Sequence, residues 1–518
     1  MAPIYRNDHL VADAIAHHAR LHGQRLAVVC GSHRLTWSAL DQRLNQLANV
    51  LIGAGCSKGT RVCMLMSNSI ESFLLFWAPV RAGCVIVPLN VMLDDASLAR
   101  LATASGGTVM FASAHTREQV DRIRADLPAV RNDGYFLFGA PADGWISADA
   151  AVNAANTSPP AVTVTPDDAM TVFYSSGTTG LPKGVEHTHF GRLNYCYGFG
   201  QGLNIDRYAV AICATPLYAS GTMITMLPAL YYGGTVVLLE KFSPADFAHA
   251  VTSEGGTHSF MVPAMYVALL NYVEPSADLS SLRVLVSAGQ TMPLVTRDAL
   301  AARIPGSGIY EVYGMTEGFF TIALPGDFAL GKRNTVGMPG FLEDIRILDE
   351  DDVEVPRGET GEIVAYGAGM MKGYLGAPEL TEQAIWVSET GRTYLRSGDL
   401  GHLDEDGFLY VSGRKKDMIK SGGINIYAVD LEEVLAAHPA VAEVAVVGIP
   451  HPRWMETPIG VVTLRPGQTV AAEELLEWTN GQLAKYQRLT AVFMREDFPR
   501  ATYGKVQKDK LREEYAQG

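Results

Sequence analysis

Short apolar runs alternate with segments of helical periodicity along residues 10–89. Apolar residues recur at helical spacing in residues 10–22 and 71–82, whereas residues 61–66 and 85–89 are short, nearly continuous apolar runs. Strands that alternate with helices of this length are typical of βαβ units, in which helices cover a parallel sheet. We therefore predict an α/β fold with mainly parallel sheets. At 518 residues the chain is too long for one ordinary core, so two or more domains are expected.

A loop rich in glycine and hydroxyl groups follows another apolar run. Residues 169–173 predict a buried strand, and residues 174–184 then read Tyr-Ser-Ser-Gly-Thr-Thr-Gly-Leu-Pro-Lys-Gly. Glycines bring backbone N–H groups close to a ligand, hydroxyls donate to phosphate oxygens, and a lysine adds positive charge. We predict a phosphate-binding loop built from Ser175, Ser176, Gly177, Thr178, Thr179, Gly180 and Lys183.

This loop differs from the Walker A motif of P-loop nucleotide-binding switches. That motif places its lysine directly after a glycine, with Ser or Thr following at the start of a helix. Here Pro182 precedes the lysine and Gly184 follows it. We expect the next helix to begin later, with Thr188 as its N-cap. A P-loop switch is therefore disfavoured.

The ten residues from Ser175 to Gly184 resemble the phosphate loop of the adenylate-forming enzymes. This family contains acyl-CoA synthetases, the adenylation domains of peptide synthetases, and firefly luciferase. Three further segments resemble family motifs in the family's order: residues 309–317 (Ile-Tyr-Glu-Val-Tyr-Gly-Met-Thr-Glu), residues 394–400 (Tyr-Leu-Arg-Ser-Gly-Asp-Leu) and the Pro-Arg…Gly-Lys segment ending at Lys505. The last departs from the family pattern, because Ala501 and Thr502 follow the arginine. The resemblance covers nearly the whole chain.

The resemblance implies a domain organisation. It predicts a large N-terminal domain of α/β subdomains at residues 1–413, a hinge at 414–417 around Lys416, and a small mobile α+β domain at 418–518. A hinge needs residues that absorb backbone rotation between two packed bodies. Lys505, in the small domain, is the implied catalytic cation.

The resemblance also implies roles for nucleotide-binding residues. Tyr313 presents a flat face to the base, Thr316 offers a hydroxyl to the α-phosphate, and Glu317 holds Mg²⁺, which prefers carboxylate and phosphate oxygens. Thr316 and Glu317 join Lys505 as catalytic residues. Asp399 suits the two ribose hydroxyls, because one carboxylate has two acceptor oxygens. The remaining predicted ATP or AMP contacts are Ser287, Gly289, Glu311, Val312 and Arg414.

The acyl pocket implied by the resemblance is mostly apolar and uncharged. The family's Pro-Leu-Phe-His type segment is Pro216-Leu217-Tyr218-Ala219 here, so alanine stands in place of the histidine. Residues 218–230 otherwise predict a buried helix. No aspartate that would hold a substrate ammonium occurs at 217–221, which disfavours an amino acid. The predicted pocket residues are Tyr218, Ala219, Ser220, Gly221, Ser287, Ala288, Gly289, Gly314 and Met315, and they favour an aromatic or medium-chain acid.

Composition excludes several classes of protein. The net charge of −14 argues against a general binder of nucleic acid or anionic membranes. The six cysteines form no C-x-x-C and no metal-binding spacing, so we expect them buried in a reducing, cytoplasmic compartment. The apolar run at 73–88 is interrupted by Pro79, Arg81 and Gly83 and is too short to cross a bilayer.

The leading hypothesis is an AMP-forming acyl-CoA synthetase that uses ATP, Mg²⁺ and coenzyme A. Its expected partners are a small-molecule carboxylic acid and CoA, without nucleic acid, and the expected assembly is a homodimer. One alternative is a stand-alone adenylation enzyme that loads an aryl or fatty acid onto a carrier protein. Another is a non-catalytic binding protein, which is disfavoured because Lys183, Glu317, Asp399 and Lys505 are all present.

Overall fold

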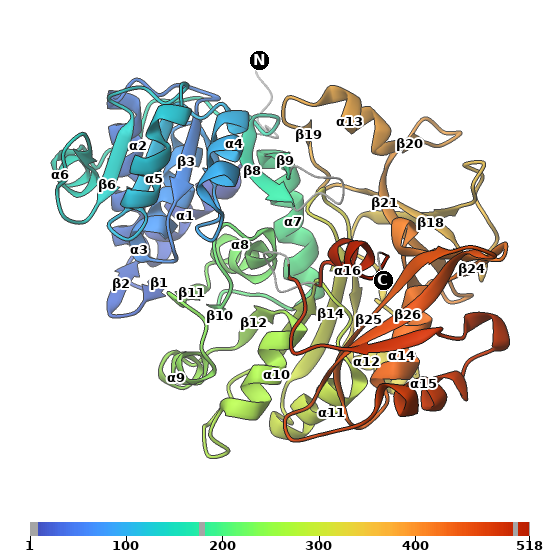
Figure 1. Cartoon of the computed structure of the whole chain (residues 1–518). Helices are drawn as coiled ribbons and strands as arrows, with labels where there is room; N and C mark the ends of the chain where they lie inside the picture. Colours follow the sequence, from blue (N-terminus) through green and yellow to red (C-terminus); the bar gives the residue numbers. More distant parts are fainter. Residues whose placement is uncertain (1–8, 176–181, 501–505, 517–518) are drawn as a thin grey trace. The chain divides into compact units, whose positions relative to one another are not determined.

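The computed structural model describes residues 9–175, 182–500 and 506–516 (Figure 1). The chain divides into two compact units, which are described separately. The first unit comprises Met1–Arg333, Pro339–Asp344 and Tyr366–Ile385, and the second comprises Asn334–Met338, Ile345–Ala365 and Trp386–Gly518. The predicted hinge at 414–417 and the mobility of the C-terminal domain remain predictions.

The first unit contains a sheet in the order β19-β9-β8-β4-β3-β5-β6-β7. The pairs from β8 to β7 are parallel, whereas β8–β9 and β9–β19 are antiparallel. Successive residues of β3 enter two different cores: Val62 and Met64 face one, and Cys63 and Leu65 face the other. Both faces are therefore buried, as expected of a parallel sheet. The strands are β3 (Arg61–Leu65), β4 (Val85–Pro88), β5 (Val109–Ser113), β6 (Tyr135–Phe138), β7 (Ile146–Ser147), β8 (Ala169–Ser175), β9 (Lys183–Thr188) and β19 (Gly373–Tyr374).

A second sheet in this unit runs in the order β15-β14-β13-β12-β10-β11-β1-β2. The pairs from β14 to β1 are parallel, whereas β1–β2 and β14–β15 are antiparallel, and β16 (Met338–Pro339) continues the sheet beyond β15. Parallel strands place their carboxyl ends at one edge, where ligands bind in α/β proteins. The strands are β1 (Leu26–Cys30), β2 (His33–Thr36), β10 (Val210–Cys213), β11 (Thr235–Leu238), β12 (His258–Met261), β13 (Val284–Ala288), β14 (Gly308–Gly314) and β15 (Phe320–Ala323).

A layer of helices lies between these two sheets. One core contains residues of both sheets together with α1 (Val11–His22), α2 (Trp37–Gly53), α3 (Ile70–Arg81), α7 (His189–Gly202) and α8 (Met223–Tyr232). The outer faces are covered by α4 (Asp95–Ser105) and α5 (Arg117–Ile123) on the first sheet, and by α9 (Pro244–Glu254), α10 (Pro263–Tyr272) and α11 (Leu294–Arg303) on the second. The predicted α/β class with mainly parallel sheets is confirmed.

Local sequence explains where several helices begin. The Thr188 hydroxyl accepts a hydrogen bond from the Gly191 N–H, so α7 begins where the sequence predicted. The predicted helix at 218–230 begins later than expected. A 3₁₀ turn, η2 (Ser220–Thr222), comes first, and the Thr222 hydroxyl donates to the Pro216 carbonyl at 2.6 Å. Residues 218–222 are therefore turn, and α8 starts at Met223.

The second unit has the predicted α+β character (Figure 1). One sheet pairs β18 (Gly361–Gly367), β21 (Thr393–Leu403) and β22 (Leu409–Arg414), and residues 404–407 lie in the hairpin turn between the last two. The other sheet contains β23 (Ile419–Ser421), β25 (Val441–His451), β26 (Met455–Leu464) and β27 (Ala491–Met494). One face packs on α14 (Ala428–Ala436) and α15 (Ala472–Asn480), and the other packs on α16 (Lys508–Tyr515).

One predicted helix is longer than the observed one. From the sequence alone, residues 471–483 predict a single helix, but α15 ends at Asn480. The side chain of Asn480 exchanges two hydrogen bonds with the backbone of Leu489, at 2.8 and 2.9 Å. Asparagine competes in this way with helical hydrogen bonding, and here it ends the helix.

Two expectations from composition concern burial and membranes. All six cysteines are buried and free, as predicted. Among the described residues, no helix combines the length and apolarity needed to cross a bilayer.

The buried carboxyl group of Glu343 should make the stability of the protein depend on pH. Its Oε2 atom is buried without a hydrogen-bond partner, and burial raises the pKa of this carboxyl to about 9, although the Phe320 N–H lowers it. A folded-state pKa above the ordinary value means that this group favours folding at low pH, and that the benefit is lost as pH rises towards 9. Glu343→Gln should therefore raise the melting temperature relative to wild type more at pH 8.5 than at pH 6. Glu382→Gln, at an exposed position, is the control. A difference that does not grow with pH would contradict the burial of an unpaired acid.

Candidate nucleotide and acyl site

The predicted phosphate loop joins the two strands of a hairpin. Strand β8 ends at Ser175 and β9 begins at Lys183, and these two residues are opposite each other in antiparallel register. A strand, and not a helix, follows the loop, in agreement with the expectation that it is no Walker A motif. Ser176, Gly177, Thr178, Thr179 and Gly180 lie outside the described residues. We call β8, β9 and the loop between them the phosphate hairpin.

Tyr374 connects the lysine of this hairpin to Glu317. The Lys183 Nζ atom lies 4.7 Å from the centre of the Tyr374 ring, and the hydroxyl of Tyr374 donates to Glu317 Oε1 at 2.8 Å. Burial, together with the Glu317 carboxylate, raises the pKa of Tyr374 above its ordinary value, so the hydroxyl stays a donor. The Glu317 carbonyl also accepts the Met371 N–H at 2.7 Å. The lysine and carboxylate predicted for triphosphate and Mg²⁺ therefore lie around one tyrosine.

Thr316 is held on two sides. Its hydroxyl shares a hydrogen bond with the hydroxyl of Ser220, at 2.9 Å. Its carbonyl lies 2.7 Å from Nε2 of His187 on β9. The η2 turn brings Ser220, from the predicted acyl pocket, into contact with the residue predicted for the α-phosphate. The structure thus joins these two parts of the predicted site.

Other predicted residues meet at the carboxyl ends of β13 and β14. In the parallel register Ser287 pairs with Glu311 and Ala288 pairs with Val312. The hydroxyl of Ser287 is buried without a hydrogen-bond partner, which suits a group awaiting a ligand. Gly289 follows with φ +88°, a left-handed conformation that favours glycine.

The side chain of Glu311 contacts other residues of the protein. Its Oε1 accepts the Met292 N–H at 3.2 Å, and its Oε2 lies 3.6 Å from Nη2 of Arg297. Burial raises the pKa of Glu311 to about 7, while the nearby guanidinium lowers it. Any nucleotide contact from Glu311 would therefore come from its backbone, and its carboxylate anchors the segment after β13.

The surroundings of the predicted acyl pocket are neutral. Ala219 is buried, and burial raises the pKa of Tyr218. A Cβ at Gly221 would lie 2.7 Å from the Phe260 ring, so this glycine allows close packing. Gly314 is the last residue of β14, and Met315 follows it directly. These positions carry no charge, in keeping with an apolar acyl group.

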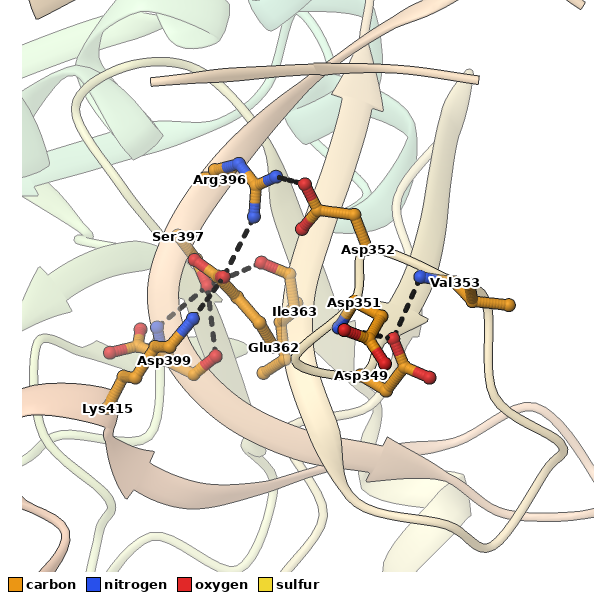
Figure 2. Close-up of polar contacts among 10 residues, drawn as sticks. All are labelled: Asp349, Asp351, Asp352, Val353, Glu362, Ile363, Arg396, Ser397, Asp399 and Lys415. Carbon is orange, nitrogen blue, oxygen red and sulfur yellow. Dashed lines mark hydrogen bonds and ion pairs between the residues drawn. The ribbon is translucent and has the colours of Figure 1, made fainter. Parts of the chain in front are cut away.

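The predicted ribose residue belongs to the second unit. Asp399 Oδ1 lies 2.8 Å from Nε of Arg414, so the two residues predicted to contact the nucleotide pair with each other. Figure 2 shows how Asp399 is positioned: its N–H donates to the Ser397 hydroxyl, which donates to the Ile363 carbonyl. Hydrogen bonds within β21 and to the neighbouring strand β18 thus fix the position of Asp399.

The predicted hinge segment consists of four consecutive charged residues, each with a partner in the second unit, and Arg414 pairs with Asp399 as described above. Lys415 contacts the buried carboxylate of Glu362 at 2.9 Å, beside Arg396 at 3.0 Å (Figure 2). Lys416 Nζ lies 2.7 Å from Asp509, and Asp417 lies 3.1 Å from Arg512, both on α16. Rotation at Lys416 would have to rearrange these ion pairs. Lys505 lies outside the described residues.

The donor set fits a magnesium ion shared with phosphate. In the part of the chain that the structure describes, no cluster of three or more His, Cys, Asp or Glu residues forms a dedicated metal cage. Mg²⁺ bound with nucleotide phosphates commonly takes only one or two protein carboxylates. Glu317 supplies one buried carboxylate beside the phosphate hairpin.

Three residues of this site were missed by the sequence analysis. Tyr374 lies 57 residues from Glu317, and His187 lies 129 residues from Thr316. The third is Arg192, which contacts His187. No local pattern links such positions, since a tyrosine or histidine near a strand end is common in any fold. The pairing of β9 with β19 places Tyr374 beside the strand that carries His187. Arg192 follows His187 by five residues, in α7.

Comparison with known proteins agrees with the predicted motifs. The model of the AMP-binding enzyme family matches residues 15–375, and that of the AMP-binding enzyme C-terminal domain matches residues 430–505. A feruloyl-CoA synthase from an Amycolatopsis species is 36% identical over 508 residues, covering 96% of this chain and 97% of that protein. An indoleacetate–CoA ligase from Aromatoleum aromaticum is 31% identical over 514 residues, covering 97% and 98%.

A solved structure agrees as well. The ATP-bound MatB from Rhodopseudomonas palustris is 28% identical, with a TM-score of 0.86, and the match covers 98% of this chain and 99% of that one. The resemblance to adenylate-forming enzymes is therefore confirmed. Because the family model spans most of the chain and relatives align over nearly their whole length, this protein belongs to the AMP-binding enzyme family.

Proposed function

We propose that this protein is an AMP-forming acid–CoA ligase. It activates a carboxylic acid with ATP to an acyl-adenylate and then transfers the acyl group to coenzyme A. The observation that carries this proposal is the arrangement of Lys183 and Glu317 around Tyr374, which suits a triphosphate with its metal ion. The similarity to CoA ligases along almost the entire chain supports the same reaction.

The first step joins two anions, so it needs positive charge and hydrogen-bond donors. A carboxylate oxygen of the acid attacks the α-phosphorus, and the bond to pyrophosphate breaks. Lys183 would bind the β- and γ-phosphates together with Thr178 and Thr179, and Thr316 would donate to the α-phosphate. Glu317 would hold Mg²⁺, which neutralises phosphate charge when bound. No single donor need supply more than about 3–4 kcal/mol.

The second step needs a thiol at the acyl carbon. The sulfur attacks the carbonyl carbon of the acyl-adenylate, and AMP leaves with the electron pair of the broken C–O bond. In the proposal Lys505 neutralises the carboxylate and α-phosphate during the first step, and rotation at Lys416 removes it before the second. Asp399 binds the ribose hydroxyls, with Arg414 nearby.

We propose an aromatic carboxylic acid as the substrate class. The neutral surroundings of Ala219, Ala288 and Ser287 favour an apolar, uncharged acyl group. Relatives named for feruloyl and indoleacetate substrates support an aromatic ring. A medium-chain acid is the alternative in the same pocket.

Compartment and assembly complete the proposal. Six buried free cysteines suit the reducing cytoplasm. The homodimer stays a prediction, which sedimentation equilibrium would test.

The reaction itself is tested with purified protein, ATP, Mg²⁺ and a panel of aromatic and aliphatic acids, with and without CoA. We expect AMP, pyrophosphate and acyl-CoA, with the highest kcat/KM for an aromatic acid. If the acyl-adenylate does not react with CoA but loads a carrier protein, then the carrier protein, and not CoA, is the acceptor. Release of ADP alone would contradict adenylation.

Lys505→Ala tests the catalytic cation. Loss of a charge that acts at the reacting oxygens should lower the kcat of adenylation by about 100-fold or more, while ATP binding is retained. Pyrophosphate exchange and nucleotide titration measure the two effects. Lys510→Ala, on α16, is the matched control. Unchanged exchange in the Lys505 variant would remove this lysine from the mechanism.

Tyr374→Phe tests the proposed metal carboxylate. The variant keeps the ring against Lys183 but removes the hydroxyl that holds Glu317. The Mg²⁺ concentration for half-maximal exchange should rise about 3- to 10-fold, because one hydrogen bond to a charged group is lost. An unchanged Mg²⁺ dependence would show that this bond does not orient the carboxylate for metal.

A further inference from the structure

The carbonyl of Thr316 is held by a histidine whose protonation is set by its other neighbour. His187 Nδ1 lies 3.1 Å from Nη2 of Arg192, and its Nε2 lies 2.7 Å from the Thr316 carbonyl oxygen. The Val185 backbone also lies near the imidazole, but a guanidinium can only donate, so the contact with Arg192 requires Nδ1 to accept. The proton then sits on Nε2, which donates to the carbonyl. The imidazole is therefore neutral, in one tautomer.

Burying the cation of Arg192 at this position is energetically unfavourable. Only 3% of it is exposed, and its guanidinium lies 5.3 Å from the centres of the Phe173 and Tyr195 rings. No carboxylate forms an ion pair with it among the described residues. Burial lowers the pKa of Arg192 to about 10, and burial, with the charge of Arg192, keeps the pKa of His187 well below its ordinary value. A buried cation without an acidic partner costs free energy, which points to a use beyond packing.

This contact joins two parts of the proposed site. His187 lies on β9, the strand of the phosphate hairpin that begins with Lys183, and Thr316 directly precedes Glu317. Tyr374, on the neighbouring strand β19, holds the Glu317 carboxylate. The turn at Thr316 is therefore attached to β9 by its backbone, and to β19 by the side chain of Glu317.

We propose that His187, oriented by Arg192, is a positioning residue for adenylation. Its Nε2–H fixes the position of the Thr316 peptide. The Thr316 hydroxyl and the Glu317 carboxylate are thereby held at a fixed position relative to the phosphate hairpin. The proposal rests on the proposed function and adds to it a residue that reaches neither substrate nor metal. The competing explanation is a buried hydrogen bond that only stabilises the fold.

Three substitutions separate positioning from packing. His187→Gln keeps an N–H near the position of Nε2, His187→Asn keeps an amide nearer the position of Nδ1, and His187→Leu keeps only bulk. We expect the Leu and Asn variants to lose about 10- to 100-fold in the kcat of ATP–pyrophosphate exchange, because a small displacement of reacting groups has that effect. The Gln variant should stay within about threefold of wild type, with the acid KM little changed in all three.

The second half-reaction provides the internal control. CoA thioester formation from synthetic acyl-adenylate involves neither pyrophosphate nor its metal ion, so it depends on the Thr316 contact but not on Glu317. Its rate should therefore fall less than the rate of exchange in all soluble variants. Wild-type exchange in the Leu variant overturns the proposal. Equal loss in both half-reactions together with a lower melting temperature also overturns it, as does a Gln variant no better than Asn. If the Leu variant fails to fold, the comparison of Gln with Asn decides alone.

A failure of the proposed function is recognised separately. Wild-type protein that binds ATP with Mg²⁺ yet exchanges no pyrophosphate with any acid refutes the reaction, not the positioning role. ATP affinity with Mg²⁺, measured against affinity in EDTA, then tests the role: Leu should weaken only the Mg²⁺-dependent part, and Gln should restore it. Equal affinities for the two variants would overturn the role.

Discussion

Glu317 and Lys183 lie around the same aromatic ring, and the proposed chemistry depends on that arrangement. Two opposite charges in a partly buried site attract each other strongly, and a direct ion pair would leave neither free for a ligand. Here the Tyr374 hydroxyl occupies one carboxylate oxygen while its ring receives the ammonium. The tyrosine thus gives each charged group a weak partner, which phosphate and metal can replace or supplement.

The rest of the first unit keeps these groups in place. Both sheets are buried on both faces, with helices packed between and outside them. Such a scaffold holds strand ends with little freedom, and the site residues lie at strand ends or in the turns that follow them. The Arg297–Glu311 pair anchors the segment after β13, and the Arg192–His187 pair supports the turn after β14. Buried charged groups next to the site thus act on backbone segments, each through hydrogen bonds to a named N–H or carbonyl.

Local sequence predicted the fold class correctly, because strands and helices depend on neighbours in the chain. The phosphate loop stays a prediction from its contiguous motif. Apolar runs and caps such as Thr188 determine where strands and helices begin, and the glycine and hydroxyl spacing of the loop is itself contiguous. Local sequence failed where a hydrogen bond to a residue outside the predicted element decides the outcome. The end of α15 depends on a hydrogen bond between Asn480 and Leu489, and the 3₁₀ turn before α8 depends on Thr222 and Pro216. Tyr374 and His187 were missed because their partners, Glu317 and Thr316, are distant in the chain. Arg192 was missed because its role follows only from the position of His187.

The central claim is that the phosphate hairpin and Glu317 together bind ATP with its metal ion. A crystal structure with Mg²⁺ and a non-hydrolysable ATP analogue tests it most directly. The account predicts that the β- and γ-phosphates contact Lys183 and the loop before it, and that Mg²⁺ is coordinated by Glu317, whose other contact is the Tyr374 hydroxyl. A triphosphate bound away from the hairpin, or a metal ion held without Glu317, would contradict it.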